Sequence, residues 1–386
     1  MELFECENGR LPEGVLPHKY DRFVAFTLPE GSFRKAAVDY MRKMATFEWT
    51  PLENCGTSLN KPNWKYTHNY EKGVTYRGLP YASSNRSFGD FLKNIEENGG
   101  KFRDLTSKEN AAKIHQNWWF WGVECNSSTD CAIQQFSPIA NHVARQYMPS
   151  FKDEFIGILH GDVTVPEGAT KTAYMIEASG EDKIFENYSL ADMGDIIMHK
   201  NEDSGMCHVR MLTEKPHVEY KDGRIDPENS YLTCIEQTDS FDKTRTDGVL
   251  TTWRVDKKYP FAILLQKNYI AMTLEVYKTN KSIVPYLALD RLPKDEDLKK
   301  GRLFGIVSSD YPITYCYLKL FDKDGKQVNK VEYHERYGAF AVALAEYSDK
   351  LFCGVCPGEY KLVIEAGLHR GDATLYSGEF TYSGRE

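Results

Sequence analysis

Two cysteines stand close together in residues 118–136, which read WWFWGVECNSSTDCAIQQF. Cys125 and Cys131 lie just behind a turn and at the head of an amphipathic pattern with helical period. A thiol becomes a nucleophile at neutral pH when its thiolate is stabilised. A helix N-terminus provides this stabilisation through its free N–H groups and its positive dipole end. The segment therefore predicts a thiol nucleophile at the start of a helix.

The sequence leaves a choice between the two cysteines. The need of a thiolate for a helix N-terminus favours Cys125 as the nucleophile. Cys131 is the alternate, because Ser128 or Thr129 would cap a helix that starts at Cys131. Either thiol can instead be a small buried hydrophobic group, which is the usual role of a cysteine within a helix.

A thiolate nucleophile also needs an imidazole within reach, and the imidazole needs a polar group that orients it. Residues 194–214, GDIIMHKNEDSGMCHVRMLTE, predict a strand, a turn and a second strand that begins near His208. Residues 230–238, SYLTCIEQT, predict a further strand that carries Glu236. Gln237 is the alternate orienting residue if the register differs by one residue.

Three helices are expected before residue 150. The first follows Ser32 and ends before Pro51, and apolar residues recur in it at helical spacing. This apolar face consists of Phe33, Ala37, Tyr40, Met41, Met44 and Phe47. The second helix, in SFGDFLKNIEENGG, is stopped by Gly99. The third follows Cys125 and continues to Tyr147.

Beyond residue 149 the pattern changes to short strands, beginning with TAYMIEA and including YPFAILLQKNYIAMTLEVY, with Gly-Asp and Asp-Gly turns. Helices followed by an antiparallel sheet are an α+β layout. From Lys281 onward only strand patterns occur, which predicts an all-β Ig-like sandwich, with the charged PKDEDLKKG as an exposed loop or edge. The expected domains are residues 1–280, with an N-terminal helical extension, and an independently folding accessory sandwich at residues 281–386.

Composition excludes several classes of protein. The formal net charge of −8 argues against binding to nucleic acid, which needs a basic face. No apolar run approaches the roughly 20 residues of a membrane helix, so no membrane span is expected. The nine cysteines fit no compact disulfide framework or zinc ribbon, and the single CGVC at residues 353–356 predicts strand and turn. We expect no metal and no cofactor.

Five motifs follow one another between roughly residues 44 and 277. They are RGLPY with Tyr81, GVEC with Cys125, GDII from Gly194, HVRM with His208 and IEQ with Glu236. In type and order they resemble the motifs of the NlpC-type papain-like cysteine peptidases, a family of bacterial cell-wall hydrolases. The sequence departs from that pattern at Arg210, where the family has glycine.

This resemblance implies a papain-like NlpC-type domain, with helices packed on an antiparallel sheet, and a thiol-dependent amide hydrolase. Cys125 would attack an amide carbonyl, and His208 would give a proton to the leaving amine. Glu236 would orient His208, and Tyr81 would help to bind the oxyanion or the substrate. The implied substrate is a peptide or a peptidoglycan fragment cleaved in its stem peptide.

Two other functions stay open at this point. One is a non-catalytic module of the same fold that binds a peptide or glycan, for which the aromatic NWWFW at residues 117–121 is suited. The other is an acyltransferase or amidase that acts on a different amide. The sandwich is expected to contact a protein or a glycan. The resemblance implies a bacterial protein, but localisation is left unassigned, with export after removal of a signal as one alternative.

Overall fold

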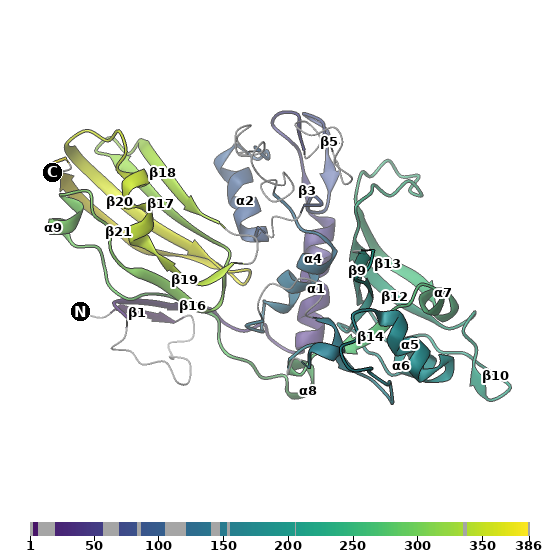
Figure 1. The fold of residues 1–386 in the computed structure, drawn as a ribbon. Helices are drawn as coiled ribbons and strands as arrows, with labels where there is room; N and C mark the ends of the chain where they lie inside the picture. Colours follow the sequence, from purple (N-terminus) through teal and green to yellow (C-terminus); the bar gives the residue numbers. More distant parts are fainter. Residues whose placement is uncertain are drawn as a thin grey trace.

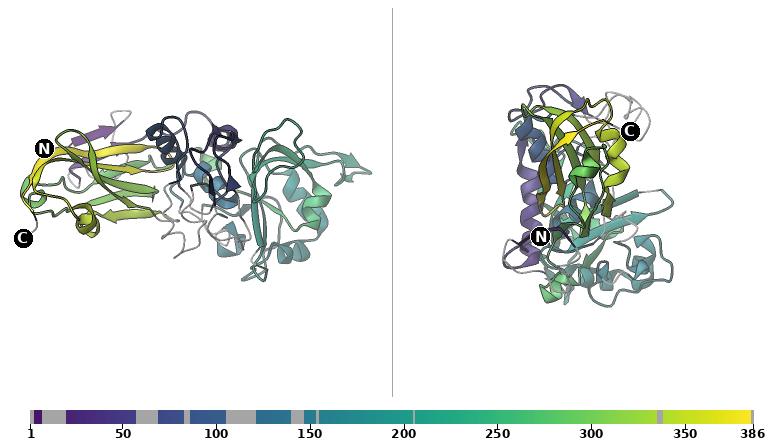
Figure 2. Two further views of the ribbon diagram at one scale, coloured as in Figure 1. Left: turned by 90° about the horizontal axis from the view of Figure 1, so that it is seen from above. Right: turned by 90° about the vertical axis from the view of Figure 1, so that its left-hand side faces the viewer.

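The computed structural model describes residues 3–6, 20–56, 69–82, 86–104, 121–139, 147–152, 155–204, 206–334 and 338–384. Helices and several sheets are both present in these ranges, which confirms the expected α+β class. Three parts lie side by side across the molecule: a β-sandwich, a central part that contains the longest helix, and a six-stranded sheet (Figures 1 and 2). The central part therefore contacts both of the others.

The six-stranded sheet is antiparallel throughout and has the strand order β13-β12-β9-β8-β14-β7. Its strands, in that order, are Trp253–Pro260, Tyr231–Gln237, Met206–Leu212, Ile196–Asn201, Ile270–Thr273 and Ile158–Leu159. The two strands expected to carry the imidazole and its orienting carboxylate, β9 and β12, are neighbours at the middle of the sheet.

Helices cover both faces of this sheet. On one face lie α1 (Phe33–Thr46) and α4 (Cys125–Ile133), and on the other α6 (Glu181–Ser189) and α7 (Phe261–Gln266). In strand β9, Val209 and Met211 belong to the core beneath α1 and α4, whereas Leu212 belongs to the core beneath α6 and α7. Because alternate strand residues face opposite sides, His208 and Arg210 share the face of Leu212.

The central part holds the loop that carries RGLPY. This loop follows a two-strand hairpin of β3 (Glu48–Trp49) and β6 (Tyr76–Arg77) and precedes α2 (Phe88–Glu97). Trp49 anchors the loop, because its ring makes tilted or edge-on contacts with Tyr70, Phe91 and Phe102, and its Nε1 donates to the Gly78 carbonyl at 2.9 Å. The loop is thus fixed by side chains far from it in sequence.

The third part consists of two sheets that share one apolar core. The first sheet, in the order β1-β2-β15-β16-β19, comprises Leu3–Cys6, Arg22–Ala25, Tyr286–Leu289, Ile306–Ile313 and Ala339–Ala343. The second, in the order β18-β17-β20-β21, comprises Gln327–Tyr333, Tyr315–Asp322, Gly358–Gly367 and Asp372–Tyr382. This is the layered arrangement of a β-sandwich.

The sandwich includes strands from the beginning of the chain. β2 pairs with β15 in antiparallel register over four residues, from Arg22–Leu289 to Ala25–Tyr286. Strand β2, which comes from residues 1–280, is therefore part of the sandwich together with strands from residues 281–386. The sequence of β2, RFVA, gives no information about which strand will pair with it. Its partner depends on which sheet edge lies next to it in the folded chain.

Three short segments differ from the strand or loop expected for them. TAYMIEA lies in α5 (Thr172–Ser179), residues 261–266 of the expected strand run form α7, and PKDEDLKKG contains α9 (Asp295–Leu298). Short apolar runs fit a buried helix or a strand equally well, so tertiary packing decides between them. The helix after Cys125 ends at Ile133, and residues 140–146 of its expected continuation lie outside the described ranges, as do residues 117–120.

Candidate active site

The helix α4 begins at Cys125. The preceding residue, Glu124, is its N-cap, and the Glu124 backbone N–H donates to Ser127 Oγ at 2.8 Å, which is one half of a capping box. Cys125 is thus in the first turn, whereas Cys131 lies near the C-terminal end of the same helix. Only Cys125 has the helix N-terminus that stabilises a thiolate.

The Cys125 thiol is enclosed between α4 and strand β9. Its side chain is 7% exposed, and its sulfur lies 3.4 Å from Asn126 Oδ1. Burial raises the pKa of Cys125 well above its usual value, and the nearby Cys207 and Glu124 add to this, while backbone N–H groups of Val209 and Asn126 act in the opposite direction. In this closed arrangement Cys125 is a protonated thiol.

His208 and Glu236 contact each other, as the sequence predicts. Glu236 Oε2 accepts hydrogen bonds from His208 Nε2 and from Arg210 Nε, the latter at 2.6 Å, and Glu236 Oε1 accepts one from the Tyr259 hydroxyl. The Arg210 guanidinium lies between the rings of Tyr259 and Tyr269, 4.1 and 4.2 Å from their centroids. Both oxygens of the Glu236 carboxylate therefore accept hydrogen bonds.

This network keeps Glu236 ionised. Burial would raise the pKa of its carboxyl, but the hydrogen bond from His208 and the positive charge of Arg210 hold that pKa well below its usual range. Because Glu236 occupies His208 Nε2, the nitrogen left to face a thiol is Nδ1. A carboxylate on one ring nitrogen fixes the orientation and tautomer of an imidazole.

Cys125 and the His208–Glu236 pair lie on opposite faces of the sheet, because α4 covers one face and His208 shares the face of Leu212. β9 and β12 are paired at only two positions, Met211–Ile235 and Leu212–Cys234, and on the other side of β12 the register with β13 shifts between Cys234 and Glu236. At the level of His208 the two strands are therefore unpaired, and it is there that the Val209 N–H reaches the Cys125 sulfur. No hydrogen bond joins Cys125 to His208 in the part of the chain that the structure describes.

The RGLPY loop brings Tyr81 beside the segment that precedes the nucleophile. Val123 donates to the Pro80 carbonyl at 3.0 Å and accepts from the Ala82 N–H at 3.2 Å, which gives a parallel bridge between Tyr81 and Val123. A Cβ at Gly122 would lie 2.3 Å from the Pro80 oxygen, so only glycine allows this approach. Close packing against the Pro80 carbonyl thus explains why GVEC has glycine at position 122.

The alternate residue Gln237 has a different task from Glu236. Its Nε2 donates to the Leu79 carbonyl at 2.8 Å, and Trp253 Nε1 donates to the same oxygen at 3.0 Å. Gln237 therefore ties β12 to the RGLPY loop and faces away from the side of the sheet that holds His208. Among the two, Glu236 is the residue that contacts the imidazole.

The alternate nucleophile Cys131 meets a histidine of the sandwich. Its sulfur lies 3.5 Å from His369 Nε2, and both side chains are buried. His369, which the sequence leaves without a partner, is thereby placed against the helix that begins at Cys125. Burial lowers the pKa of His369 to about 3 and raises that of Cys131 well above its usual value, so this is a neutral thiol–imidazole pair.

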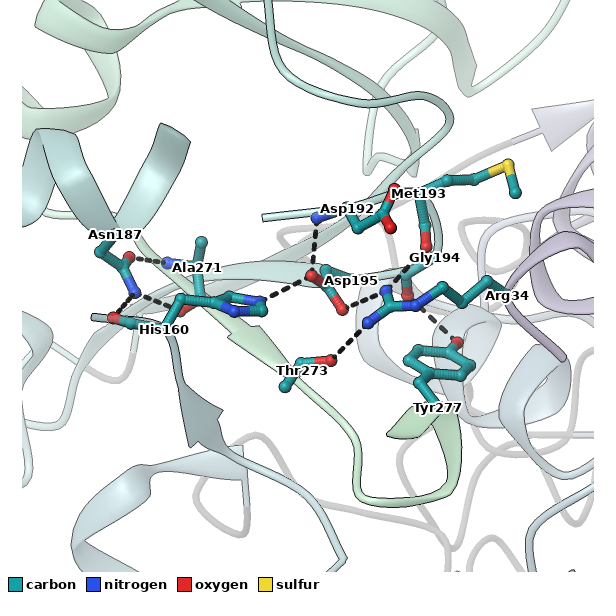
Figure 3. A network of polar contacts seen from close by, with 10 residues as sticks. All are labelled: Arg34, His160, Asn187, Asp192, Met193, Gly194, Asp195, Ala271, Thr273 and Tyr277. Carbon is teal, nitrogen blue, oxygen red and sulfur yellow. Dashed lines mark hydrogen bonds and ion pairs between the residues drawn. The ribbon is translucent and has the colours of Figure 1, made fainter. Parts of the chain in front are cut away.

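The GDII motif is a structural junction between α1 and the sheet. Asp195, fully buried, accepts from Arg34 Nη1 at 2.6 Å and contacts His160 Nε2 at 2.7 Å (Figure 3). Arg34 also donates to Thr273 Oγ1 at 3.1 Å. Gly194 has a φ of +84°, and a Cβ there would lie 3.1 Å from the Arg34 backbone. The motif thus holds α1 on the sheet.

Comparison of the chain with models of known families, with curated proteins and with solved structures finds no match. Arg210 and Tyr259 both contact the Glu236 carboxylate, and sequence reasoning did not assign either residue to the site. Arg210 had a usable indication, because it stands two residues after His208 and must share its strand face.

No group of three or more His, Cys, Asp or Glu residues that could hold a metal ion occurs within the described ranges. Cys353 and Cys356 of CGVC are exposed free thiols in the turn before β20. No helix within those ranges is long and apolar enough to cross a membrane.

Proposed function

We propose that the protein is a thiol-dependent amide hydrolase with Cys125 as nucleophile and His208 as base. One observation carries the proposal: Cys125, at the N-terminus of α4, lies against the β9 backbone at Val209, next in sequence to His208, whose imidazole is anchored through Nε2 by the ionised Glu236. A nucleophile at a dipole end, a base and a group that orients the base are the parts of a cysteine hydrolase.

The reaction would proceed through a thioester. The Cys125 thiol gives its proton to His208 Nδ1, and its sulfur attacks the amide carbonyl carbon. His208 then returns the proton to the nitrogen of the leaving amine as the C–N bond breaks. Water, deprotonated by His208, cleaves the thioester and restores the thiol. Tyr81, held beside Val123, would contact the oxyanion or the substrate.

Activation of Cys125 requires a local opening between α4 and β9. In the closed arrangement the thiol is buried and protonated, and it makes no hydrogen bond with His208. The unpaired stretch between β9 and β12 is where the imidazole could meet the sulfur, because the ladder there has no hydrogen bonds to break. Substrate entry at this point would bring the two groups together.

The substrate class follows from the resemblance of the five motifs to NlpC-type peptidases, which would make the fold of the sheet part papain-like and NlpC-type. The amide would then belong to a cell-wall stem peptide. We also propose an Ig-like relation for the sandwich, from its two sheets, antiparallel except for the pair β1–β2, around one core.

Alkylation and cleavage test this function together. Iodoacetamide below pH 7, followed by peptide mapping, should label Cys125 faster than Cys207 and Cys234, and His208→Ala should slow that labelling. Peptidoglycan fragments incubated with the full chain should yield free amines, and Cys125→Ala should abolish the yield while Cys353→Ala, at an exposed thiol of the sandwich, retains it. Equal labelling of all accessible thiols, with no cleavage, would contradict the hydrolase.

A second candidate is a non-catalytic binding module. It is favoured by an open groove of about 970 Å³ on the sandwich, lined by residues of β17, β20, β21 and α9 that include Lys319, Glu365 and Phe380. Such a groove would hold a polar peptide or glycan. Binding of peptidoglycan fragments that is unchanged in Cys125→Ala, without any product, would support this candidate. Transfer of the acyl group to an added amine would instead indicate an acyltransferase.

A further inference from the structure

The turn between β20 and β21 leaves the sandwich and enters the central part. This turn, residues 368–371, contacts α4 and the residues just after it: His369 Nε2 lies 3.5 Å from Cys131 Sγ of α4, and the His369 carbonyl accepts from Gln135 Nε2, beyond the end of the helix, at 2.9 Å. The same carbonyl accepts from the Tyr40 hydroxyl of α1 at 3.2 Å. One residue of the sandwich thus contacts both α1 and α4, the latter through Cys131.

Neighbouring residues fix the turn in place. Arg370 Nε donates to the Thr27 carbonyl at 2.7 Å, and a Cβ at Gly371 would lie 2.9 Å from the Phe26 ring. His369 itself is only 4% exposed. A buried contact with this many hydrogen bonds orders the backbone on both sides of it. The turn is therefore held by the sandwich on one side and by the helices of the central part on the other.

The contact lies at the end of α4 opposite to Cys125. Cys131 is six residues after Cys125, which corresponds to about 9 Å along a helix. A helix of this length moves as a rigid rod, so a displacement at Cys131 is transmitted to Cys125. The other helix of the junction, α1, is tied to the six-stranded sheet by Arg34 and Asp195 (Figure 3). The junction thus connects the nucleophile helix to the sheet that carries His208.

We infer that His369 of the sandwich is a positioning residue that sets the alignment of Cys125 with His208 through α4. This inference rests on the proposed function for its catalytic meaning. It assigns the sandwich a part in building the site, in place of the accessory role expected from the sequence. A misplacement of about 1 Å in a catalytic group can cost about a hundredfold in rate.

The test is the alkylation rate of Cys125 by iodoacetamide in full-length variants. His369→Ala should lower that rate at least about tenfold. His369→Gln should restore most of it, because the glutamine amide can reach the position of Nε2, and a loss of packing alone would not be rescued in this way. His334→Ala is the matched control, since His334 contacts the Thr314 carbonyl inside the sandwich. It should leave the rate unchanged.

Hydrogen–deuterium exchange provides a readout that does not depend on reactivity. In His369→Ala, amides of residues 125–133 should exchange faster than in the wild type, while those of β17 should not change. Unchanged exchange in α4 together with unchanged alkylation would overturn the inference. If His369→Ala does not fold, Cys131→Ala removes the same contact from the other side and should give the same changes in exchange.

The two proposals fail in different ways. A wild-type Cys125 that reacts no faster than Cys207 would refute the hydrolase, yet exchange in α4 would still report whether His369 holds the helix. A reactive Cys125 whose rate is the same in His369→Ala and His334→Ala would leave the hydrolase standing and refute the positioning role.

Discussion

Arg210 donates from Nε, at 2.6 Å, to the same oxygen of Glu236 that contacts His208. The guanidinium also stacks between two tyrosine rings, so it is held in one place by side chains of three different segments. A positive charge buried beside the carboxylate allows Glu236 to stay ionised while it orients the imidazole. In the proposed mechanism Arg210 therefore supports the base without touching the substrate.

Replacement of Arg210 should destabilise the fold. Arg210→Met leaves the Glu236 carboxylate buried without its cation, and loss of one partner of a buried ion pair costs about 3–5 kcal/mol. Urea unfolding followed by circular dichroism would measure this loss. The double variant Arg210→Met/Glu236→Gln should recover part of it, since no uncompensated charge is left. Equal stabilities of the single and double variants would argue against the pair.

The Glu236 carboxylate should make stability depend on acid pH. Its pKa in the folded protein is held well below the usual 4.5, so the folded state binds fewer protons than the unfolded state at mildly acid pH. Its contribution is fully present above that usual value and is lost as the pH falls below it. Urea midpoints measured from pH 7 down to pH 3 should therefore fall more steeply for the wild type than for Glu236→Gln. Parallel curves would contradict this linkage.

Gly78 should tolerate no side chain. It has a φ of +81°, and a Cβ there would lie 2.3 Å from Trp253 Cδ1. Gly73 is a matched control, because its φ is +78° and no atom lies within 4 Å of its Cβ position. Both alanine variants bear the backbone strain, so Gly78→Ala should lose about 1–3 kcal/mol more than Gly73→Ala from the clash. Thermal melting of both proteins checks the difference.

The buried pair at the GDII motif should matter more than a surface pair on the same helix. Arg34→Met leaves the fully buried Asp195 without its cation, at a cost of about 3–5 kcal/mol. Arg42→Met removes an exposed pair with Asp256 and should cost less than about 1 kcal/mol. Chemical denaturation of the two variants in parallel would compare them. Similar losses would indicate that the junction shown in Figure 3 contributes little.

Local patterns of the sequence determined several features of this protein correctly. The cap at Ser32, the apolar spacing after it and the stop at Gly99 predict α1 and α2, and the start of α4 falls at Cys125 as expected. The contact between His208 and Glu236 also follows the predicted strands. Helix caps, turns and strand alternation depend on residues within a few positions of one another, so they can be predicted from the local sequence.

Only the tertiary structure decided which distant segments meet. Cys131 and His369 are 238 residues apart, Arg34 and Asp195 are 161 apart, and β2 joins β15 across most of the chain. The face of the sheet on which His208 lies relative to α4 was equally undetermined. A periodic pattern predicts that a side chain is buried, but it does not predict which residues that side chain will contact. Those contacts depend on the packing of the whole chain, and sequences with the same pattern can pack in different ways.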